Sequence, residues 1–489
     1  AGTCRDLVGA PCQTACPVGT EVWRYVANAA LGQYEDAYKV IRRANPLPSI
    51  CARICNHPCE SMCRAGTTGG EPISARELKR FIVDRVDPAV YPVRRKPAGP
   101  DAKRVAVVGG GPAGLTAAHR LSLKGHRITV FEREDRPGGM LISGIPAYRL
   151  PRDVIEREID ALIDDNIEIR CNQALGRDFT ADSLLADGYD AVYLATGSHR
   201  SRRLGIEGED GKGVYHGIRF LKAHNLRNED LGRGRVGIIG GGNSAVDAAR
   251  VAARQEGVKS VKIYYRRSAA EMPAYPEEIV AAREEGIAIA PLVSPVRIRT
   301  ASGCITGVDF LRNRLGQRDG SGRPRPVPVE GSEFTEELDT LVIAISESPD
   351  LKDLDQGLAR TLRGTLGIHP ESCATSLAGI FGGGDLAAGP RTVIEAIADG
   401  KNAAVMIDRY LFGRRLQILP RVRLPEVFIE PFDEDSEGEE VVERVHAVTL
   451  SPEERLKGFD EVESCISETA ALREARRCLR CDLDFTRPL

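Results

Sequence analysis

Two segments of the chain share a pattern in which a short apolar run precedes a glycine-rich turn and then helical periodicity. They read KRVAVVGGGPAGLTAAHRLSLKG, from Lys103 to Gly125, and RVGIIGGGNSAVDAARVAARQ, from Arg235 to Gln255. A second apolar run follows each of them, HRITVFER in the first case and VKIYYRRS in the second. A buried strand, a tight loop, a helix and a second strand form a βαβ unit. The pattern therefore predicts an α/β protein with two such units about 130 residues apart.

The regions at either end of the chain have different patterns. The segment EVWRYVANAALGQYEDAYKVIRRAN, from Glu21 to Asn45, has helical spacing, and YPVRRKPAGPDAK, from Tyr91 to Lys103, is typical of a linker. From about Arg421 the pattern is irregular and includes the acidic run EPFDEDSEGEE, which we interpret as a solvated loop. A final helix is predicted to begin near Ser467 and to end in EARRCLRCD.

The first glycine-rich loop has the order of features that a dinucleotide site needs. Gly109, Gly111, Pro112, Ala113 and Gly114 follow the apolar run directly. Glycines there allow a tight turn, close approach of the backbone to a pyrophosphate, and helix–strand packing. Glu132 ends the second strand, where a carboxylate can bind ribose hydroxyls, and Arg133 follows it. This segment is therefore predicted to bind a dinucleotide.

The second loop differs from the first at the end of its second strand. The loop contains Gly240, Gly242, Asn243, Ser244 and Ala245, with Asp247 one turn later. Its second strand ends in Arg266 and Arg267, in place of the acid. Arginine suits the 2′-phosphate of NADP, so NADP(H) is favoured over NAD(H), although two arginines could also merely end a surface strand.

Two dinucleotide sites in one chain indicate a flavoprotein. One site can hold FAD and the other the nicotinamide, so that their rings meet between two domains. In the segment FGGGDLAAGPRT, Gly384 and Asp385 are candidates for the ribityl or phosphate end of the flavin, and Thr392 follows them. We expect a helical domain at 1–95, an FAD-binding domain at 96–204 and 372–420, an NAD(P)H-binding domain at 205–371, and a C-terminal extension at 421–489.

Composition and charge exclude several other classes. The net charge is −3, and the basic residues are dispersed, so nucleic acid is not an expected partner. No apolar run approaches the ~18 residues that span a bilayer, and the N-terminal residues do not resemble a secretory signal. A cytoplasmic location is expected.

The thirteen cysteines are the unusual part of the composition, since ten lie within the first 63 or the last 25 residues. Clustered thiols in a reducing compartment more often bind metal than form disulfides. Four of them follow the spacing C-x3-C-x3-C-x3-C, from Cys51 to Cys63, which differs from the C-x2-C pairs of structural zinc sites. Iron–sulfur clusters are therefore favoured over zinc. The isolated Cys171, Cys304 and Cys373 are expected to be free thiols.

The chain resembles a family of flavin and iron–sulfur oxidoreductases. The family includes the small subunit of bacterial glutamate synthase, the FAD/NADPH half of dihydropyrimidine dehydrogenase, and the large subunit of NADH-dependent ferredoxin:NADP oxidoreductase. The segments that carry the resemblance include APCQTACPVGTEV, NPLPSICARICNHPCESMCRAG, GGMLISGIPAYRLP, AVYLATGS, YYRRSAAEMPA and FGGGDLAAGPRTVIEAIADGKNAA.

The resemblance implies a two-domain flavoprotein of the glutathione-reductase type behind a helical domain with two [4Fe–4S] clusters. By likeness, the residues near the flavin would be Gly138, Gly139, Met140, Ile145, Pro146, Thr196 and Gly197. Asn243 with Arg266 and Arg267 would bind NADP(H). One departure is that this chain has Ser346 and Glu347 where relatives usually have Gly–Gln.

The family also suggests how the cysteines divide. Relatives carry a C-x2-C pair near the N-terminus, whereas here the corresponding pair is Cys478 and Cys481. We expect this pair to fold back and to complete one cluster with Cys12 and Cys63. The alternatives are that the pair binds a cluster shared with a partner, or that it is redox-inert. The second cluster would use Cys16, Cys55 and Cys59. Its fourth ligand is left open among Glu77, Cys51 and Cys4, because Lys79 occupies the aligned position and is a poor ligand when charged.

These features predict electron transfer between NADP(H), FAD and [4Fe–4S] clusters. The flavin takes a two-electron hydride and passes single electrons on, in either direction. The chain is expected to exchange electrons with other subunits of a redox complex or with ferredoxin, and no residue is predicted to act as a general acid or base. A glutamate synthase small subunit and a non-catalytic electron-wiring or assembly subunit are the alternatives.

Overall fold

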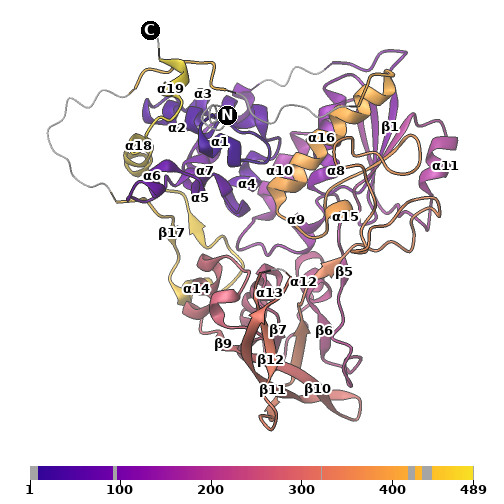
Figure 1. Ribbon diagram of the computed structural model, residues 1–489, viewed down its shortest axis with the longest axis vertical. Coiled ribbons are helices and arrows are strands. Elements are labelled where there is room, and N and C mark those ends of the chain that lie inside the picture. The colour runs from indigo at the N-terminus through magenta and orange to yellow at the C-terminus, as the bar shows by residue number, and fades with distance from the viewer. Residues whose placement is uncertain (1–8, 92–95, 321, 417–423, 432–442, 488–489) are drawn as a thin grey trace.

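The structure is a computed structural model that describes residues 9–91, 96–320, 322–416, 424–431 and 443–487. Figure 1 shows a group of helices from the N-terminal part of the chain, an α/β layer beside it, and a second α/β layer below both. The last residues of the chain run from the second layer back to the N-terminal helices. The two ends of the described chain therefore lie in one region.

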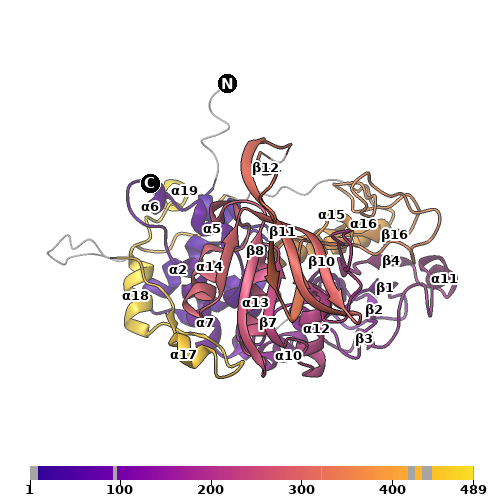
Figure 2. The ribbon, with the colours of Figure 1, turned by 90° about the horizontal axis from the view of Figure 1, so that it is seen from below.

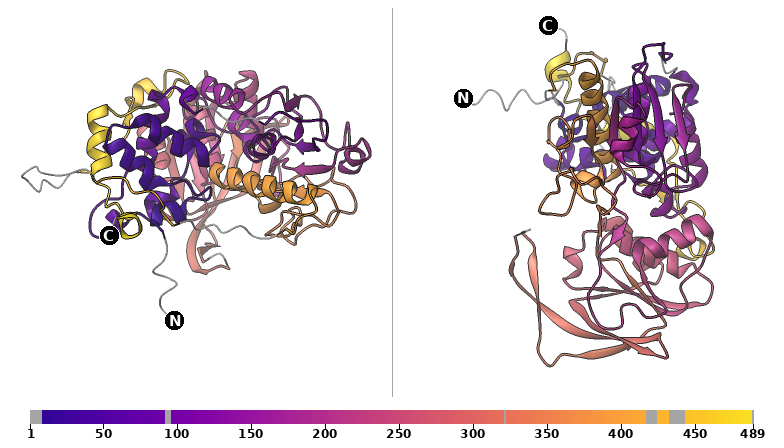
Figure 3. Two further views of the ribbon diagram at one scale, coloured as in Figure 1. Left: turned by 90° about the horizontal axis from the view of Figure 1, so that it is seen from above. Right: turned by 90° about the vertical axis from the view of Figure 1, so that its right-hand side faces the viewer.

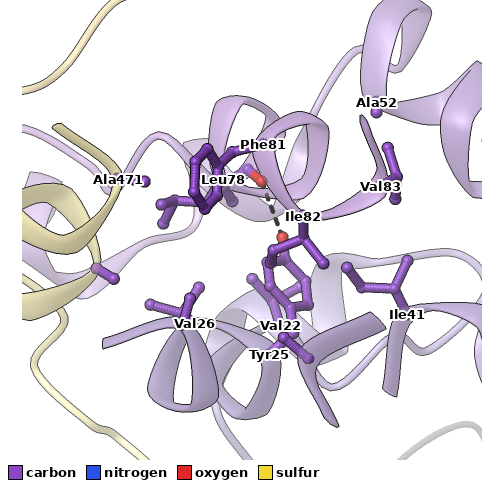
Figure 4. Close-up of a cluster of buried hydrophobic side chains, with 14 of the residues drawn as sticks. Val22, Tyr25, Val26, Ile41, Ala52, Leu78, Phe81, Ile82, Val83 and Ala471 are labelled. Carbon is purple, nitrogen blue, oxygen red and sulfur yellow. Dashed lines mark hydrogen bonds between the residues drawn. The ribbon is translucent and has the colours of Figure 1, made fainter. Parts of the chain in front are cut away.

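The N-terminal domain consists of short helices around one apolar core. Three of its helices begin with proline, whose fixed φ suits the first helical position, and Gly32 at a positive φ ends α2 before α3 begins. Tyr25 lies in this core and donates a hydrogen bond to the Ala75 carbonyl over 3.0 Å (Figure 4). The helices are α1 (Pro11–Ala15), α2 (Val22–Ala30), α3 (Tyr34–Ala44), α4 (Pro48–Ile54), α5 (Pro58–Ser61), α6 (Arg64–Thr67), α7 (Ala75–Arg85) and the 3₁₀ helix η1 (Pro88–Val90).

The first α/β layer contains a five-stranded parallel sheet in the order β16-β4-β1-β2-β3. Strands β16, β4, β1 and β2 are buried along almost their whole length because helices cover both sides, whereas the edge strand β3 has charged, less buried residues at alternate positions. The helices α8 and α16 cross closely on one face, where a Cβ on Gly400 would collide with the Ala113 carbonyl. The elements are β1 (Arg104–Val108), α8 (Pro112–Ser122), β2 (Arg127–Phe131), α9 (Met140–Ser143), α10 (Arg152–Asp160), β3 (Ile167–Arg170), α11 (Ala181–Ala186), β4 (Ala191–Leu194), β16 (Ile380–Gly382), α15 (Asp385–Ala388) and α16 (Val393–Leu411).

The second layer contains another five-stranded parallel sheet, in the order β6-β14-β7-β8-β9. A separate antiparallel sheet, in which β11 pairs with β10, β12 and β13, lies beside it (Figure 2). The short strands β5 and β15 pair where the chain passes between the layers. The elements are β5 (Arg200–Ser201), β6 (Val214–His216), α12 (Gly217–Arg227), β7 (Gly234–Ile239), α13 (Asn243–Ala253), β8 (Val258–Tyr265), η2 (Ala269–Glu271), α14 (Pro276–Glu284), β9 (Ala288–Pro291), β10 (Val293–Ala301), β11 (Cys304–Arg318), β12 (Pro324–Pro328), β13 (Phe334–Glu337), β14 (Thr340–Ile343) and β15 (Glu347–Ser348).

The C-terminal extension lies along both the second layer and the N-terminal helices (Figure 3). Its longest helix, α18, packs on α2 and α7, and Ala471 enters the core drawn in Figure 4. The Ser467 hydroxyl caps α18 by accepting a hydrogen bond from the Ala470 N–H over 3.2 Å. The elements are β17 (Val448–Thr449), α17 (Pro452–Arg455), β18 (Glu463–Ser464), α18 (Glu468–Arg476) and α19 (Leu483–Thr486).

The predicted fold class is confirmed, since both glycine-rich segments form strand–loop–helix units in parallel sheets. The helical pattern from Glu21 to Asn45 forms two helices. Most of the acidic run, and Cys4, lie outside the described residues. Within the described ranges, no helix is both long and apolar enough to cross a membrane.

Candidate functional site

Both glycine-rich loops open into one cavity of about 1290 Å³. Gly109 and Gly111 reach it from the first sheet, and Gly240 and Gly242 reach it from the second. Each loop lies at the carboxyl end of a parallel strand, where α/β sheets bind ligands. The volume exceeds the ~300–1,000 Å³ of a common small-molecule pocket, so the cavity has room for two dinucleotides.

Most of the residues predicted to bind cofactors line this cavity. Four of them, Gly114, Gly138, Pro146 and Ala245, do not line it. Those that line it are Gly109, Gly111, Pro112, Ala113, Glu132, Arg133, Gly139, Met140, Ile145, Thr196, Gly197, Gly240, Gly242, Asn243, Ser244, Asp247, Arg266, Arg267, Gly384, Asp385 and Thr392.

The glycines of the first loop have different structural roles. A Cβ on Gly109, at φ +111°, would collide with the Ala195 carbonyl, and one on Gly114 would collide with the Gly109 carbonyl. A Cβ on Gly111 would meet only the Gly139 Cα, at 3.9 Å. Gly109 and Gly114 therefore allow the turn and the helix–strand contact, whereas Gly111 leaves the space into which a pyrophosphate fits.

The second loop repeats this division of roles. A Cβ on Gly240 would collide with the Ala344 carbonyl, whereas one on Gly242 would meet no atom within 4 Å. The Asn243 side chain accepts a hydrogen bond from the Tyr275 N–H over 3.0 Å, which holds the loop beside α14. Both loops thus provide open space at the N-terminus of a helix, which favours binding of an anion.

Glu132 lies at the end of β2 and lines the cavity. Its carboxylate accepts hydrogen bonds from the Gly110 N–H over 2.8 Å and from the Glu134 N–H over 2.9 Å. Burial raises the pKa of this carboxyl group. A carboxylate has about four acceptor positions, so two hydrogen bonds leave capacity for ribose hydroxyls.

The two arginines at the end of β8 differ in their surroundings. Arg267 is 3% exposed and donates to the Pro324 carbonyl over 2.8 Å and to Asp319 over 2.7 Å. Arg266 is exposed at the cavity, and within the described residues it forms no ion pair with a carboxylate. Arg266 is therefore the arginine available to a 2′-phosphate, and Arg267 holds the hairpin of β11 and β12 in place.

The departure at Ser346 and Glu347 lies on the wall of the cavity. Ser346 has φ +135°, a backbone conformation that favours glycine and costs a serine about 1 kcal/mol or more. The Glu347 carboxyl group lies beside Ser244, and burial raises its pKa.

Asp385 begins α15 directly after Gly384, which has φ +60°. Its carboxylate accepts a hydrogen bond from the Arg391 N–H over 3.2 Å, and burial raises its pKa to about 7. Thr392 caps α16 and donates to Glu395 over 2.6 Å.

Three further residues of the cavity wall were not found from the sequence. Burial, followed by the charges of Arg133 and Lys222, lowers the pKa of His199 to about 3, so His199 is neutral at neutral pH. Lys222 forms an ion pair with Glu134 over 2.7 Å. A lone histidine and a lysine on α12 have no characteristic spacing, so no sequence signal was available to find them.

The structure brings Cys478 and Cys481 to Cys12 and Cys63, and these four residues are called the outer cysteine quartet. Burial raises the pKa of Cys478 to about 12, and the neighbouring Cys481 and Cys63 thiolates add to the effect. The Cys12 thiol also has a raised pKa, caused first by burial and then by the neighbouring thiolates of Cys478, Cys481 and Cys63.

Cys16, Cys51, Cys55 and Cys59 form a second group, called the inner cysteine quartet. All four act electrostatically on the buried Lys79 of α7. Burial raises the pKa of Cys51, Cys55 and Cys59.

Cys51 was one of three candidates for the fourth ligand of the second cluster, beside Glu77 and Cys4. Glu77 forms an ion pair with Arg76 over 3.0 Å, and Cys4 lies outside the described residues. Among the described residues, no three His, Cys, Asp or Glu side chains converge on a site for a single metal ion. A cubane cluster places iron and sulfide atoms between its thiolates, so its ligands lie farther apart than those of one ion.

Comparison with known protein families agrees with both parts of the structure. Residues 103–400 match the family described as pyridine nucleotide-disulphide oxidoreductase. The chain belongs to this family. Residues 1–89 match a second family, described as dihydropyrimidine dehydrogenase domain II, 4Fe-4S cluster. This pyridine nucleotide-disulphide oxidoreductase is therefore an FAD-dependent and nicotinamide-dependent enzyme with an N-terminal iron–sulfur domain.

Two characterised members show how much of the chain is shared. The chain is 40% identical to the NADP(+)-dependent formate dehydrogenase subunit beta of Moorella thermoacetica, over 98% of this chain and 71% of that protein. It is 33% identical to the glutamate synthase [NADPH] small chain of Escherichia coli, over 82% of this chain and 88% of that protein. The predicted resemblance is thus confirmed.

Solved structures support the fold of the nucleotide-binding part. FprA of Mycobacterium tuberculosis, in complex with NADPH, aligns with a TM-score of 0.55 at 20% identity. The alignment covers 64% of this chain and 85% of FprA. At this level of identity the likeness establishes the fold alone.

Proposed function

We propose that this chain is the subunit of a redox complex that transfers electrons between NADP(H), FAD and two [4Fe–4S] clusters. FAD binds to the first sheet, in the domain of residues 96–204 and 372–420. NADP(H) binds to the second sheet, in the domain of residues 205–371. Residues 1–95 hold the clusters together with the extension of residues 421–489.

The observation that carries this proposal is the order of the sites through the protein. Ile54 lies between two cysteines of the inner quartet and also lines the cavity. Tyr275, on the same cavity, lies within electrostatic reach of the Cys55 thiol. The outer quartet lies farther along the helical domain, and Cys481 is only half buried there. The cavity, the inner quartet and the outer quartet thus form a path towards the surface.

The residues of the first sheet fit FAD. Gly111 leaves room for the pyrophosphate, Glu132 offers acceptors to the ribose, and Asp385 faces the same cavity from α15. FAD supplies the conversion between two-electron hydride transfer and one-electron transfer. The protein contributes the position and the electrostatic surroundings of the flavin, and neutral His199 provides a polar group on the wall without adding charge.

The residues of the second sheet fit NADP(H) more closely than NAD(H). Gly242 leaves room for the pyrophosphate at the start of α13, and the guanidinium of Arg266 is available to the 2′-phosphate. A free guanidinium at the end of the second strand can bind a phosphate with two parallel hydrogen bonds. The name of the formate dehydrogenase relative, which specifies NADP(+), agrees with this assignment.

For the clusters we propose one quartet each. The outer cluster binds to Cys12, Cys63, Cys478 and Cys481, which the fold of the extension brings together. The inner cluster binds to Cys16, Cys55 and Cys59, with Cys51 in place of Glu77 or Cys4 as the fourth ligand.

The experiment is an iron and sulfide determination on the full chain, isolated without oxygen. Wild-type protein is expected to contain about eight irons, as two [4Fe–4S] clusters. The double variant Cys478→Ser, Cys481→Ser is expected to lose about half of the iron. The matched control replaces Cys304 and Cys465, two exposed cysteines outside both quartets, and should keep all of it. An unchanged iron content in the first variant would contradict the proposed outer cluster.

Reduction of an artificial dye separates this proposal from its alternatives. Flavin-loaded protein should use NADPH in preference to NADH, whereas no activity with either would favour an electron-wiring or assembly role. We also propose a cytoplasmic location, because the twelve cysteines in the described ranges are all unpaired, as expected in a reducing compartment. The electron partner is another subunit of the complex or a ferredoxin, and copurification from the native host would identify it.

A further inference from the structure

Lys79 is a buried cation with an unusual lack of acidic partners. It lies on α7 and is only 6% exposed. Two arginines on the same helix, the partly buried Arg76 and the buried Arg80, both have carboxylate partners: Arg76 pairs with Glu77 over 3.0 Å, and Arg80 pairs with Glu461 over 2.8 Å. Within the described residues, no carboxylate forms an ion pair with Lys79. A buried charge without compensation is strongly unfavourable, so the site must provide negative charge in another form.

The groups around Lys79 are the four thiols of the inner quartet. They come from the end of α1, from α4 and the residue after it, and from α5, and α4 packs directly on α7. These thiols surround a side chain that has no carboxylate partner among the described residues, so the charge of its ammonium group must be compensated by whatever the four thiolates bind.

We propose that Lys79 is the counter-ion of the inner [4Fe–4S] cluster and stabilises the reduced state of that cluster. The inference rests on the proposed function, since it requires the inner quartet to hold a cluster. Four thiolates leave a cubane cluster with a net negative charge, and one-electron reduction adds a further negative charge. A fixed positive charge in a poorly solvated site therefore stabilises the reduced form more than the oxidised form, which raises the reduction potential.

Among the described residues, Arg64 and Arg480 are the cations that act on the thiols of the outer quartet, and neither is both buried and unpaired. Of the two arginines near it, Arg64 has a side chain that is 49% exposed, and Arg480 forms an ion pair with Asp482 over 2.8 Å. Water screens the first charge, and the carboxylate compensates the second. The two clusters are therefore expected to differ in potential, with the inner cluster raised by Lys79.

The test is a redox titration, followed by electron paramagnetic resonance, of the full chain with both clusters bound. The Lys79→Met variant removes the charge and keeps the length of the side chain. We expect its iron content to stay at about eight. The equilibrium constant for reduction of one cluster should fall at least tenfold, which is about 59 mV for a one-electron couple. The other cluster should be unaffected, and Lys79→Arg, which keeps the charge, should stay close to the wild type.

Three further variants show which cluster has changed its potential. Arg64→Met removes an exposed charge near the outer quartet. It should shift the potential of either cluster by less than Lys79→Met shifts one of them. Cys51→Ser should change the spectrum of the cluster that Lys79→Met shifts, whereas Glu77→Gln should leave that spectrum unchanged. A shift of the wrong cluster, or a spectrum that responds to Glu77 and not to Cys51, would overturn the assignment.

The remaining outcomes of the redox titration and the iron determination also either support or overturn the proposal. If Lys79→Met loses half of the iron, Lys79→Arg shows whether the lost charge or the changed side-chain shape is the cause. Full iron content and an unchanged potential in Lys79→Arg would support the proposal, whereas the same loss of iron in Lys79→Arg would overturn it. Eight irons with two unshifted potentials in Lys79→Met would overturn this inference and leave the proposed function intact. A wild-type chain with only about four irons would overturn both.

Discussion

The attachment of α18 to the N-terminal domain depends on one buried carboxylate, Glu474. Its side chain is fully buried and accepts hydrogen bonds from the backbone N–H groups of Ser74 and Val445, each over 2.8 Å. Arg477 forms an ion pair with the same carboxylate over 2.7 Å. Cys478 follows Arg477 directly, so Glu474 fixes the segment that brings two thiols to the outer quartet.

The Glu474→Ala variant would leave two buried N–H groups without an acceptor. Each unsatisfied buried donor costs about 1–3 kcal/mol, so the variant should weaken the attachment of α18 by roughly 2–6 kcal/mol. Since 1.4 kcal/mol is a factor of ten, the equilibrium for local opening of α18 should rise by about thirtyfold or more. Glu474→Gln keeps one acceptor oxygen, and we expect it to lose about half as much free energy.

The assay is hydrogen exchange of the α18 amides, combined with the iron content of the isolated chain. Exchange measures local opening, which suits a chain of several domains better than a single unfolding transition does. Glu474→Ala should exchange faster across α18 and lose iron from the outer cluster over time, with the flavin retained. Glu468→Ala is the control, because its pairs with Arg85 and Tyr34 are exposed and worth at most about 1 kcal/mol. Exchange rates in α18 that match those of the control would refute the reasoning.

Three further predictions concern the cavity. Gly242→Ala should keep the melting temperature and weaken NADPH binding at least tenfold, because its Cβ would occupy the open space left for the pyrophosphate. Gly240→Ala should lower the melting temperature, because its Cβ would collide with the Ala344 carbonyl. The opposite pattern would contradict these roles. Arg266→Gln should raise the KM for NADPH at least tenfold with little effect on the KM for NADH. Arg267→Gln should instead lower thermal stability, because Arg267 holds the hairpin through Asp319. Equal effects of the two variants on the KM for NADPH would contradict these different roles. Burial raises the pKa of Asp385 to about 7, above the ordinary aspartate pKa of about 4. The contribution of Asp385 to the stability of the cofactor-free protein should therefore decline as the pH rises from about 4 to about 7. Asp385→Asn should flatten that decline, and an unaltered pH profile of urea unfolding would refute the prediction.

The parts of the fold that the sequence predicted are those determined by neighbouring residues. Each βαβ unit is complete within about 30 residues, so apolar runs and glycines were sufficient to place β1, α8, β7 and α13. The capped start of α18 after Ser467 is equally local. The Gly32 break between α2 and α3 has a positive φ as its cause, and a glycine within a helical pattern is a weaker signal.

The parts that the sequence left open depend on contacts between distant residues. Arg266 and Arg267 are adjacent, and successive side chains on a strand point to opposite faces. Both line the cavity, and which of them is available to a phosphate is determined by the hairpin that provides Asp319, about 50 residues later. The even spacing from Cys51 to Cys63 likewise gives no reason to separate Cys63 from the other three, and only the family resemblance assigned Cys63 to the cluster of Cys12, Cys478 and Cys481.

The C-terminal extension does more in this structure than carry two cysteines. Glu461 pairs with Arg53 over 2.8 Å, on the same helix as Cys51. Phe459 lies against His224 of α12, with the ring planes tilted by 31° and the ring centroids 4.0 Å apart. One short segment therefore contacts both α4, which carries Cys51, and the second nucleotide-binding layer. Any movement of that layer relative to the helical domain must break these contacts, so the extension fixes the separation between the nicotinamide site and the clusters. Since electron transfer depends on that separation, the extension is expected to influence the rate of transfer even through residues that bind no metal.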